Sequence, residues 1–288
     1  EPQESRLETD QILDRASLQS RLALHVFCKS TSKVPFVLMI SMAKVCRSKG
    51  LTNNKLMSVT LSGPMRYEIK YLVDPNQATE LESWLSGKPF VRRAFPPRQV
   101  NSIYFDSLDF ESAQDNLDGI ADRSKFRIRW YGDIDNSRKD LTFEIKSKRG
   151  RLGSKVSTSL GELTTPLMKM TNRDIESALH TDLSARPLVP QGVALQPIIY
   201  VAYERRYHEA AGGIRITFDE GLNFRQMTGN RHQSSSSTSY YQKSVLEFKF
   251  APEAKEQAAR IMRDLRLVPS RSSKYVIGLS LFGRANYI

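Results

Sequence analysis

The chain has 288 residues, and its 43 lysines and arginines outnumber 31 aspartates and glutamates, so that the formal net charge is +12. With 40% hydrophobic and 26% charged residues, the composition is that of an ordinary globular protein, long enough for one large domain with appendages. The basic excess favours an anionic partner. The sequence has no zinc-finger spacing, no RRM-type aromatic motif and no helix with a basic stripe, which argues against nucleic acid as that partner.

Residues 1–64 are predicted to be a poorly patterned N-terminal extension that ends in a polar linker. Their apolar run, Val34–Val45, is too short to cross a bilayer and does not have the position or cleavage site of a signal peptide. We therefore predict no transmembrane segment, although a membrane partner is possible. Residue 1 is glutamate, which fits a fragment, a processed product or an over-extended reading frame, with Met57 and Met65 as candidate starts.

Cysteine is sparse, since Cys28 and Cys46 lie in the extension and none follows. The body of the protein, residues 65–288, therefore has no disulfide framework, which predicts a reducing compartment and a cytoplasmic location. The four histidines share no metal-ligand spacing, and no Gly-rich phosphate loop, HExxH or GxSxG motif is present. Any chemistry must come from other side chains.

In the body, the elements follow from hydrophobic periodicity and capping residues. Strands are predicted at 66–73, 100–106, 124–132, 140–148, 198–208, 213–219 and 243–250. A helix begins with Asp74 as N-cap and Pro75 as its first residue and ends at Gly87, and a shorter one opens with a Thr171–Asp174 capping box. Pro252 starts the last helix. The basic, Gly-punctuated segment 146–155 and the closing segment around 273–275 are left without a regular element.

Charged residues recur at spacings of two along five of these strands. The sets are Glu68 and Lys70, Arg127 and Arg129, Glu144 and Lys146, Arg215 and Asp219 with Thr217 between them, and Glu247 and Lys249. Because successive side chains of a strand point to opposite faces, each set occupies one face while aromatic and aliphatic residues occupy the other. The charge therefore covers a whole face, strand after strand.

Two arrangements explain such a face. An antiparallel sheet with one wet face would expose the charges to solvent. A closed antiparallel barrel would instead pack its apolar faces outward against helices and enclose a charged lumen. In that second arrangement basic groups exceed acidic ones, so the ligand would be a polyanion with a metal held by the carboxylates.

An ordered set of motifs in the body is similar to a known family. The set comprises Arg66-Tyr-Glu-Ile-Lys-Tyr-Leu-Val73, Phe126-Arg-Ile-Arg-Trp-Tyr131, Phe143-Glu-Ile-Lys146, Tyr203-x-Arg205, Gly213-Ile-Arg-Ile-Thr-Phe-Asp219, Leu246-Glu-Phe-Lys249 and Ser273-Lys-Tyr275. In this order they resemble the VTC domain, the polyphosphate polymerase branch of the triphosphate tunnel metalloenzymes. The resemblance covers about 65–288.

This resemblance implies an α+β fold, an antiparallel eight-stranded β-barrel around a charged tunnel, with flanking helices. It implies transfer of the γ-phosphate of ATP to a growing inorganic polyphosphate chain with a divalent metal, Mn or Mg. Carried over by motif, the catalytic phosphate-holding residues would be Lys70, Arg127, Arg129, Lys146, Arg205, Arg215 and Lys274. Lys155, Tyr203, Lys249 and Ser273 would bind substrate, and Glu247 would be the metal ligand.

The first motif departs from the hydrolase and cyclase branch, which opens with Glu-x-Glu-x-Lys. This chain has Arg66-x-Glu68-x-Lys70, which removes a carboxylate, adds a cation and so favours the polymerase branch. A terminal phosphate is largely ionised at neutral pH and needs no general base as acceptor. Two other functions stay open, namely a metal-dependent triphosphate or polyphosphate hydrolase with Glu68 or Glu144 as base, and a non-catalytic polyanion-binding module.

Overall fold

The computed structural model describes residues 65–134, 137–190, 193–227 and 237–285. The predicted N-terminal extension, including both cysteines, lies outside these residues, so the boundary before residue 65 stays a prediction. In the described part of the chain, no helix has both the length and the apolar character needed to span a bilayer.

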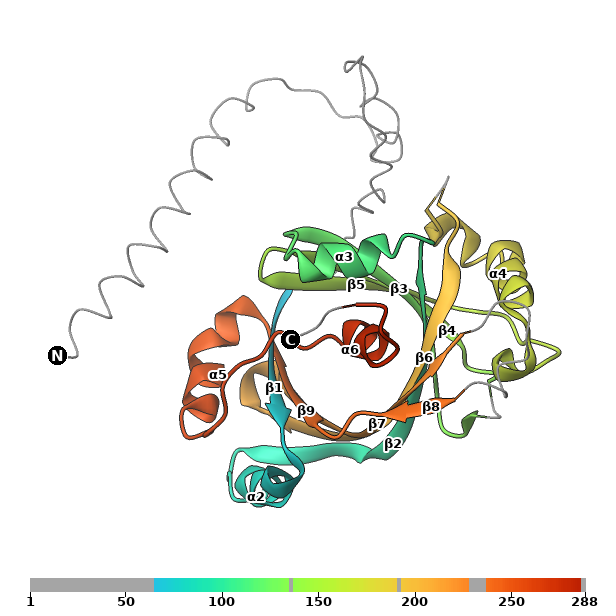
Figure 1. Ribbon diagram of the computed structural model, residues 1–288. Helices are drawn as coiled ribbons and strands as arrows, with labels where there is room; N and C mark the ends of the chain where they lie inside the picture. Colours follow the sequence, from blue (N-terminus) through green and yellow to red (C-terminus); the bar gives the residue numbers. More distant parts are fainter. Residues whose placement is uncertain (1–64, 135–136, 191–192, 228–236, 286–288) are drawn as a thin grey trace, which may run out of the picture. The chain divides into compact units, whose positions relative to one another are not determined.

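The strands of the described residues form one antiparallel sheet, and eight of them close into a ring (Figure 1). They are β1 (Arg66–Val73), β2 (Val91–Asp106), β3 (Asp122–Tyr131), β4 (Thr142–Arg149), β5 (Leu152–Ser159), β6 (Gln196–Ala210), β7 (Ile214–Gln226), β8 (Thr238–Tyr240) and β9 (Ser244–Phe250). The order around the ring is β6-β2-β3-β4-β5-β1-β9-β7, and β7 pairs back with β6. The short β8 adds to the edge of β7. The predicted antiparallel eight-stranded barrel is confirmed.

Most of the helices in the described residues flank this ring, as predicted. The described helices are α2 (Pro75–Ser86), α3 (Glu111–Leu117), α4 (Asn172–Thr181), α5 (Lys255–Met262) and α6 (Lys274–Leu281), with short 3₁₀ turns at Leu167–Lys169, Arg186–Leu188, Ala211–Gly213 and Pro252–Ala254. The Thr171–Asp174 capping box is present, with the Thr171 side chain accepting from the backbone N–H of Asp174. The helix after Asp74 begins at Pro75 and has Gly87 as its C-cap.

Two apolar cores lie on the outer face of the ring. Leu81 of α2 and Ile261 of α5 pack with outward residues of β1, β7 and β9, such as Phe248. Ile175 of α4 and the loops around it pack on β2, β3, β4 and β6, where Trp130 is fully buried. The aromatic and aliphatic residues of the alternating strands therefore face outward into helices, which leaves the charged positions on the inner face.

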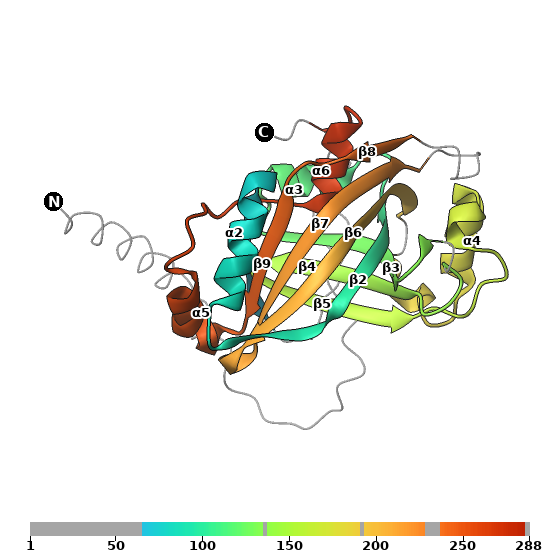
Figure 2. The ribbon, with the colours of Figure 1, turned by 90° about the horizontal axis from the view of Figure 1, so that it is seen from below.

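Helix α6 lies inside the ring, at one end of it (Figures 1 and 2). Its residues Tyr275, Ile277 and Leu279 are buried against inner-face residues of β2, β6 and β7. The Tyr275 ring stacks on Tyr104 with centroids 5.4 Å apart, and its hydroxyl donates to the buried Asp106 at 2.7 Å. The inside of the ring is thus apolar where α6 fills it. Sequence patterning missed this helix, because a run that is apolar on all sides has no amphipathic period.

Gly278 lets α6 approach the ring wall. A Cβ built at this position would lie 2.4 Å from Ile199 Cδ1 and 2.6 Å from Phe224 Cδ1. Gly→Ala inside a helix normally stabilises by about 1 kcal/mol. Here we expect Gly278→Ala to destabilise instead, by roughly 1–3 kcal/mol, because the added methyl overpacks a filled interior. Urea denaturation would measure this change.

The matched variant is Ile199→Val, which removes the Cδ1 methyl that the new Cβ would meet. Combined with Gly278→Ala, it should recover part of the lost stability, so that the two changes are not additive. A stabilised Gly278→Ala variant would contradict the packing described for α6.

Several of the described strands differ from the prediction, since β8 was not predicted and β7 ends at Gln226 rather than at 219. β2 begins at Val91, nine residues before the predicted start of 100, because Arg92 to Gln99 pair with β6 through bulges despite Pro96 and Pro97. The basic segment after β4 turns at Gly150, whose φ is +57°, and returns as β5. β5 pairs fully with β4 but meets β1 at only two positions, Arg66 with Gly153 and Tyr67 with Leu152. We call this short pairing the β1–β5 seam.

Candidate functional site

The charged positions of the alternating strands lie on the inner face of the ring, on the side of Lys274 away from the apolar part of α6. We define the inner cluster as Glu68, Lys70, Lys125, Arg127, Arg129, Glu144, Lys146, Lys155, Arg205, Asp219, Glu247, Lys249 and Lys274. Its members come from β1, β3, β4, β5, β6, β7, β9 and the start of α6. Every strand of the ring except β2 contributes at least one charged residue to the inner cluster.

Glu144 of β4 is the centre of the first group. It is only 2% exposed, and Arg127 Nε donates to its Oε2 at 2.7 Å while Lys155 Nζ donates to its Oε1 at 2.8 Å. Arg129 Nη1 lies 3.6 Å from Oε1. Although burial raises the pKa of this carboxyl, the three cations outweigh it and hold the pKa well below its usual value. Glu144 therefore stays ionised.

Asp219 of β7 is the centre of the second group and is fully buried. Arg205 grips it with two hydrogen bonds, Nε to Oδ1 at 2.5 Å and Nη2 to Oδ2 at 2.7 Å, and Lys274 Nζ donates to Oδ2 at 2.6 Å. Burial opposes ionisation of Asp219, but Arg205 and Lys274 hold its pKa well below the usual range. The Tyr203 ring lies under both cations, 5.2 Å from Arg205 Cζ and 4.7 Å from Lys274 Nζ.

Glu68 of β1 is the centre of the third group. Lys146 Nζ reaches it from β4, on the far side of β5, at 2.6 Å from Oε2, and Lys70 Nζ lies 2.9 Å from Oε1. Burial raises the pKa of Glu68, yet Lys146, Lys70 and Lys249 together hold it well below its usual value. Burial in turn lowers the pKa of Lys146 to about 8, with Glu68 opposing and Lys70 adding to the shift.

Lys125 is a cluster member that the sequence reasoning missed. Its Nζ donates to Asn116 Oδ1 and to Ser273 Oγ, each at 2.7 Å, which are both neutral acceptors. Burial, followed by the neighbouring Lys70 and Lys146, lowers its pKa well below the usual value. The signal was present, since Lys125 extends the alternation of Arg127 and Arg129 by one step toward the start of β3.

The inner cluster has nine cations and four carboxylates, so positive charge is in surplus although every carboxylate of the cluster has cation partners. Several donors on the same inner face are also buried without a hydrogen-bond partner. These are Arg129 Nε, the hydroxyls of Ser102 and Thr217, and the hydroxyl of Ser272 just before α6. A buried donor without an acceptor is costly. The surplus positive charge and these free donors both call for an anion with many oxygens.

The carboxylates also suit a divalent cation. Glu247 is 3% exposed, and its Oε1 makes no hydrogen bond although Lys249 Nζ lies 3.0 Å away. Glu68 sits diagonally across the β1–β9 pairing, and Glu247 is close enough to contribute to the lowered pKa of Glu68. No group of three His, Cys, Asp or Glu ligands occurs in the described residues. A divalent ion here would therefore take one or two carboxylates and complete its shell with phosphate and water oxygens, as Mg²⁺ commonly does.

The structure brings together almost all of the residues predicted from motifs. Ser273, the N-cap of α6, contacts the inner cluster as an acceptor for Lys125, and Lys155 reaches Glu144 although its side chain is 47% exposed. Arg215 differs. It lies on the inner face at the start of β7, opposite Lys249, but is exposed at the end of the ring away from α6. Its predicted role in holding phosphate stays a prediction.

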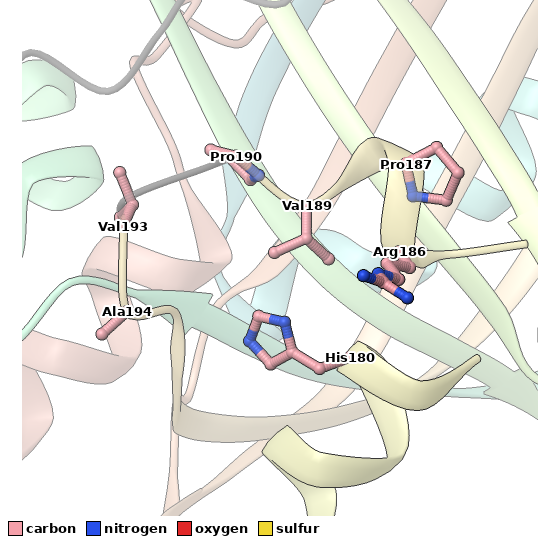
Figure 3. Close-up of a pocket in the computed structure, with 7 residues that line it drawn as sticks. All are labelled: His180, Arg186, Pro187, Val189, Pro190, Val193 and Ala194. Atoms are coloured by element: carbon pink, nitrogen blue, oxygen red, sulfur yellow. The ribbon is translucent and has the colours of Figure 1, made fainter. Parts of the chain in front are cut away.

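A separate cavity of about 690 Å³ lies outside the ring, between the end of α4 and the segment that follows it (Figure 3). His180 and Arg186 line it together with Val189 and other apolar residues. It contains no residue of the inner cluster and no carboxylate among its lining residues. The surplus cations and free donors are found in the ring, so the ring is the candidate site.

A protein-family model described as the VTC domain matches residues 65–282 of this chain. The chain belongs to the VTC domain family. The match covers every strand of the ring and α6, so the VTC domain includes the whole inner cluster. No curated protein matches the sequence.

Solved structures similar to this VTC domain are distant in sequence. A protein from Hippeastrum, described with a dominant triphosphatase activity, has 16% identity and a TM-score of 0.45 over 75% of this chain and 95% of its own. A candidate adenylate cyclase from Vibrio parahaemolyticus has 13% identity and a TM-score of 0.44 over 75% and 99%. A chain of the Schizosaccharomyces pombe Mediator head module has 6% identity and a TM-score of 0.42 over 72% and 100%. Similarity at this level gives no information about the activity of this VTC domain.

Proposed function

We propose that this VTC domain is an ATP-dependent polyphosphate polymerase, which transfers the γ-phosphate of ATP to the end of an inorganic polyphosphate chain. One observation carries the proposal: the inner cluster keeps surplus cations and free buried donors on a closed inner face. Polyphosphate is a flexible chain of anionic oxygens with no other feature to recognise. The family membership supports a function with polyphosphate or triphosphate.

In the proposed reaction, a terminal oxygen of the polyphosphate chain attacks the γ-phosphorus of ATP, the bond to the β-γ bridging oxygen breaks, and ADP leaves. The main barriers are repulsion between two anions and the charge that develops on the departing oxygens. Arg127 and Arg129 suit the phosphates because a guanidinium can donate two parallel hydrogen bonds. Arg205 of β6 and Lys274 of α6, held in place by Asp219, would add further fixed positive charge.

A divalent Mn or Mg ion, held by Glu247 with Glu68 beside it, would neutralise charge on the donor phosphates when bound. Lys70, Lys146 and Lys249 surround these two carboxylates and would bind the oxygens that the ion does not take. Lys155 would exchange its ion pair with Glu144 for one with a phosphate at a small cost in free energy, because about half of its side chain is already exposed to solvent.

The state of the two candidate bases favours the phosphate acceptor over water. A hydrolase needs a general base whose pKa lies near the working pH. Cations hold the pKa values of Glu68 and Glu144 well below their usual range, which makes both carboxylates weak bases. An ionised phosphate acceptor needs no base.

The deciding experiment incubates the purified chain with ATP labelled at the γ-phosphate and with Mn²⁺, and separates the products on a gel. Label in a growing ladder of chains supports the polymerase, and its release as free phosphate would make the protein a hydrolase. Failure to produce either would leave only polyanion binding. An Arg127→Ala/Arg129→Ala sample made in parallel controls for contaminating enzymes.

The pKa of Lys146 gives this proposal a pH signature. Bound phosphate stabilises the protonated lysine, so binding must take up a proton once the pH exceeds the unliganded pKa of about 8. We expect triphosphate affinity to fall as pH rises from 8 to 9.5, by up to tenfold per unit, whereas Lys146→Arg should fall much less because arginine stays protonated. Isothermal titration calorimetry measures both the affinity and the proton uptake. Parallel pH profiles for the two proteins would contradict the role of Lys146, since other titrating groups act equally in both.

A further inference from the structure

Three aromatic rings and one arginine lie together where the inner face of the ring continues beyond Arg205. Arg98 stands directly opposite Arg205 in the β2–β6 pairing, and Phe95 stands opposite Tyr207. Tyr131 belongs to the same face because it pairs with Val100, which itself pairs with Tyr203. This group therefore extends the row of inner-face residues that contains Arg205, which is hydrogen-bonded to Asp219.

Arg98 lies against these rings. Its Cζ is 4.8 Å from the centroid of Tyr131, 5.1 Å from that of Tyr207 and 5.7 Å from that of Phe95. The Phe95 and Tyr207 rings meet edge to face at 5.9 Å. A guanidinium stacked on rings presents a flat, polarisable surface with donors at its edge, which suits a flat aromatic ligand.

These rings are also open to a ligand. Phe95 is 58% exposed and Tyr131 is 42% exposed. Beside them, the Tyr207 hydroxyl is buried without a hydrogen-bond partner. β3 ends at Tyr131, opposite Val100, so among the described strands the earlier part of β2 pairs with β6 alone. The inner face is therefore more accessible here, beside the cations that are proposed to bind phosphate.

We propose that Phe95, Arg98, Tyr131 and Tyr207 form a nucleobase platform on which the base of the nucleoside triphosphate stacks while its phosphates enter the inner cluster. This inference rests on the proposed function and adds a reason for the site to prefer a nucleotide donor over inorganic triphosphate. A base has two π-faces, and stacking on aromatic rings and arginine is a common way to bind it. A ribose separates the base from its first phosphate, which matches a platform placed one step along the strands from Arg205.

The test compares two ligands, ATP and inorganic triphosphate, by isothermal titration calorimetry on the full chain without metal. We expect the wild-type chain to bind ATP more tightly than its triphosphate charge alone explains. Phe95→Ala/Tyr131→Ala should weaken ATP binding by roughly tenfold or more, the range for loss of base stacking, and change triphosphate binding less than about twofold. Phe90→Ala/Tyr240→Ala is the matched control, because it removes one exposed phenylalanine and one exposed tyrosine elsewhere.

Equal losses for ATP and triphosphate in the double variant would overturn the platform and leave the phosphate site intact. An unchanged ATP affinity would overturn the platform as well. Aromatic residues that only stabilise β2 would affect the stability of the protein but not the difference between its affinities for ATP and triphosphate. Phe95→Trp keeps an aromatic ring at this exposed position and should keep or increase the preference for ATP. Binding of neither ligand by the wild-type chain would instead overturn the proposed function, and this inference with it.

Discussion

Replacing Arg127 and Arg129 together by alanine is expected to remove most of the stabilisation that triphosphate gives to the folded protein. A ligand that binds only the folded state raises the melting temperature in proportion to its binding free energy. Hydrogen bonds to charged groups contribute about 1.5–3 kcal/mol each, so loss of both guanidinium groups should weaken binding roughly a hundredfold or more. Differential scanning fluorimetry across a triphosphate titration measures the effect.

The double variant is also expected to be less stable without ligand. A further substitution separates this loss of stability from the loss of binding. Arg127 is bonded to the buried Glu144, so the double variant leaves a buried carboxylate with fewer partners and should lose about 3 kcal/mol or more of stability. Adding Glu144→Gln should restore much of this stability without restoring the response to triphosphate. Arg173→Ala/Arg260→Ala removes the same charge from the exposed faces of α4 and α5 and should keep the full shift. A full shift in the Arg127→Ala/Arg129→Ala protein would refute the inner cluster as the anion site.

Glu247→Gln is expected to abolish turnover that depends on a divalent ion, with a fall of at least about a hundredfold. Glutamine keeps the size of the buried side chain but cannot supply an anionic oxygen to Mn²⁺ or Mg²⁺. Triphosphate binding without metal should be unchanged or slightly stronger, because the substitution frees Lys249 and removes a negative charge. Turnover as a function of Mn²⁺ concentration, with metal-free calorimetry beside it, separates the two effects.

Two further variants make this result specific. Glu256→Gln, on the exposed face of α5, is the matched control and should retain normal metal dependence. Glu68→Gln should weaken metal dependence less than Glu247→Gln does, because Lys146 and Lys70 already occupy both oxygens of Glu68. If Glu68→Gln has the larger effect, the roles of the two carboxylates are reversed. Unaltered metal dependence in both would exclude this pair as the metal site.

Strand alternation was sufficient to predict the fold class and most of the inner cluster. Phe126, Ile128 and Trp130 had to face a core, which fixed Arg127 and Arg129 on the opposite face wherever β3 lay. Closure of the ring did not follow from any one strand, because a wet sheet has the same alternation. It was implied by the family resemblance that the ordered motifs carry, and the pairing of β7 with β6 confirms it.

The remaining features depend on contacts between residues far apart in sequence. Lys146 meets Glu68 across β5, and Lys274 meets Asp219, at separations that carry no periodic signal. β5 was missed because Gly150 and Gly153 interrupt a short polar run, and α6 because its apolar run has no amphipathic period. The aromatic group around Arg98 was missed because the two prolines before it are unusual within a strand.

The β1–β5 seam has fewer paired residues than the other strand pairings of the ring. Seven register pairs join β1 to β9, against two that join β1 to β5, and the Lys146–Glu68 ion pair spans the seam from β4 to β1. Closure at this point therefore depends on a side-chain ion pair more than on main-chain bonding. Backbone amides along β5 should accordingly have the least protection from hydrogen exchange of the ring strands, and the wall should open at this line first when the protein fluctuates.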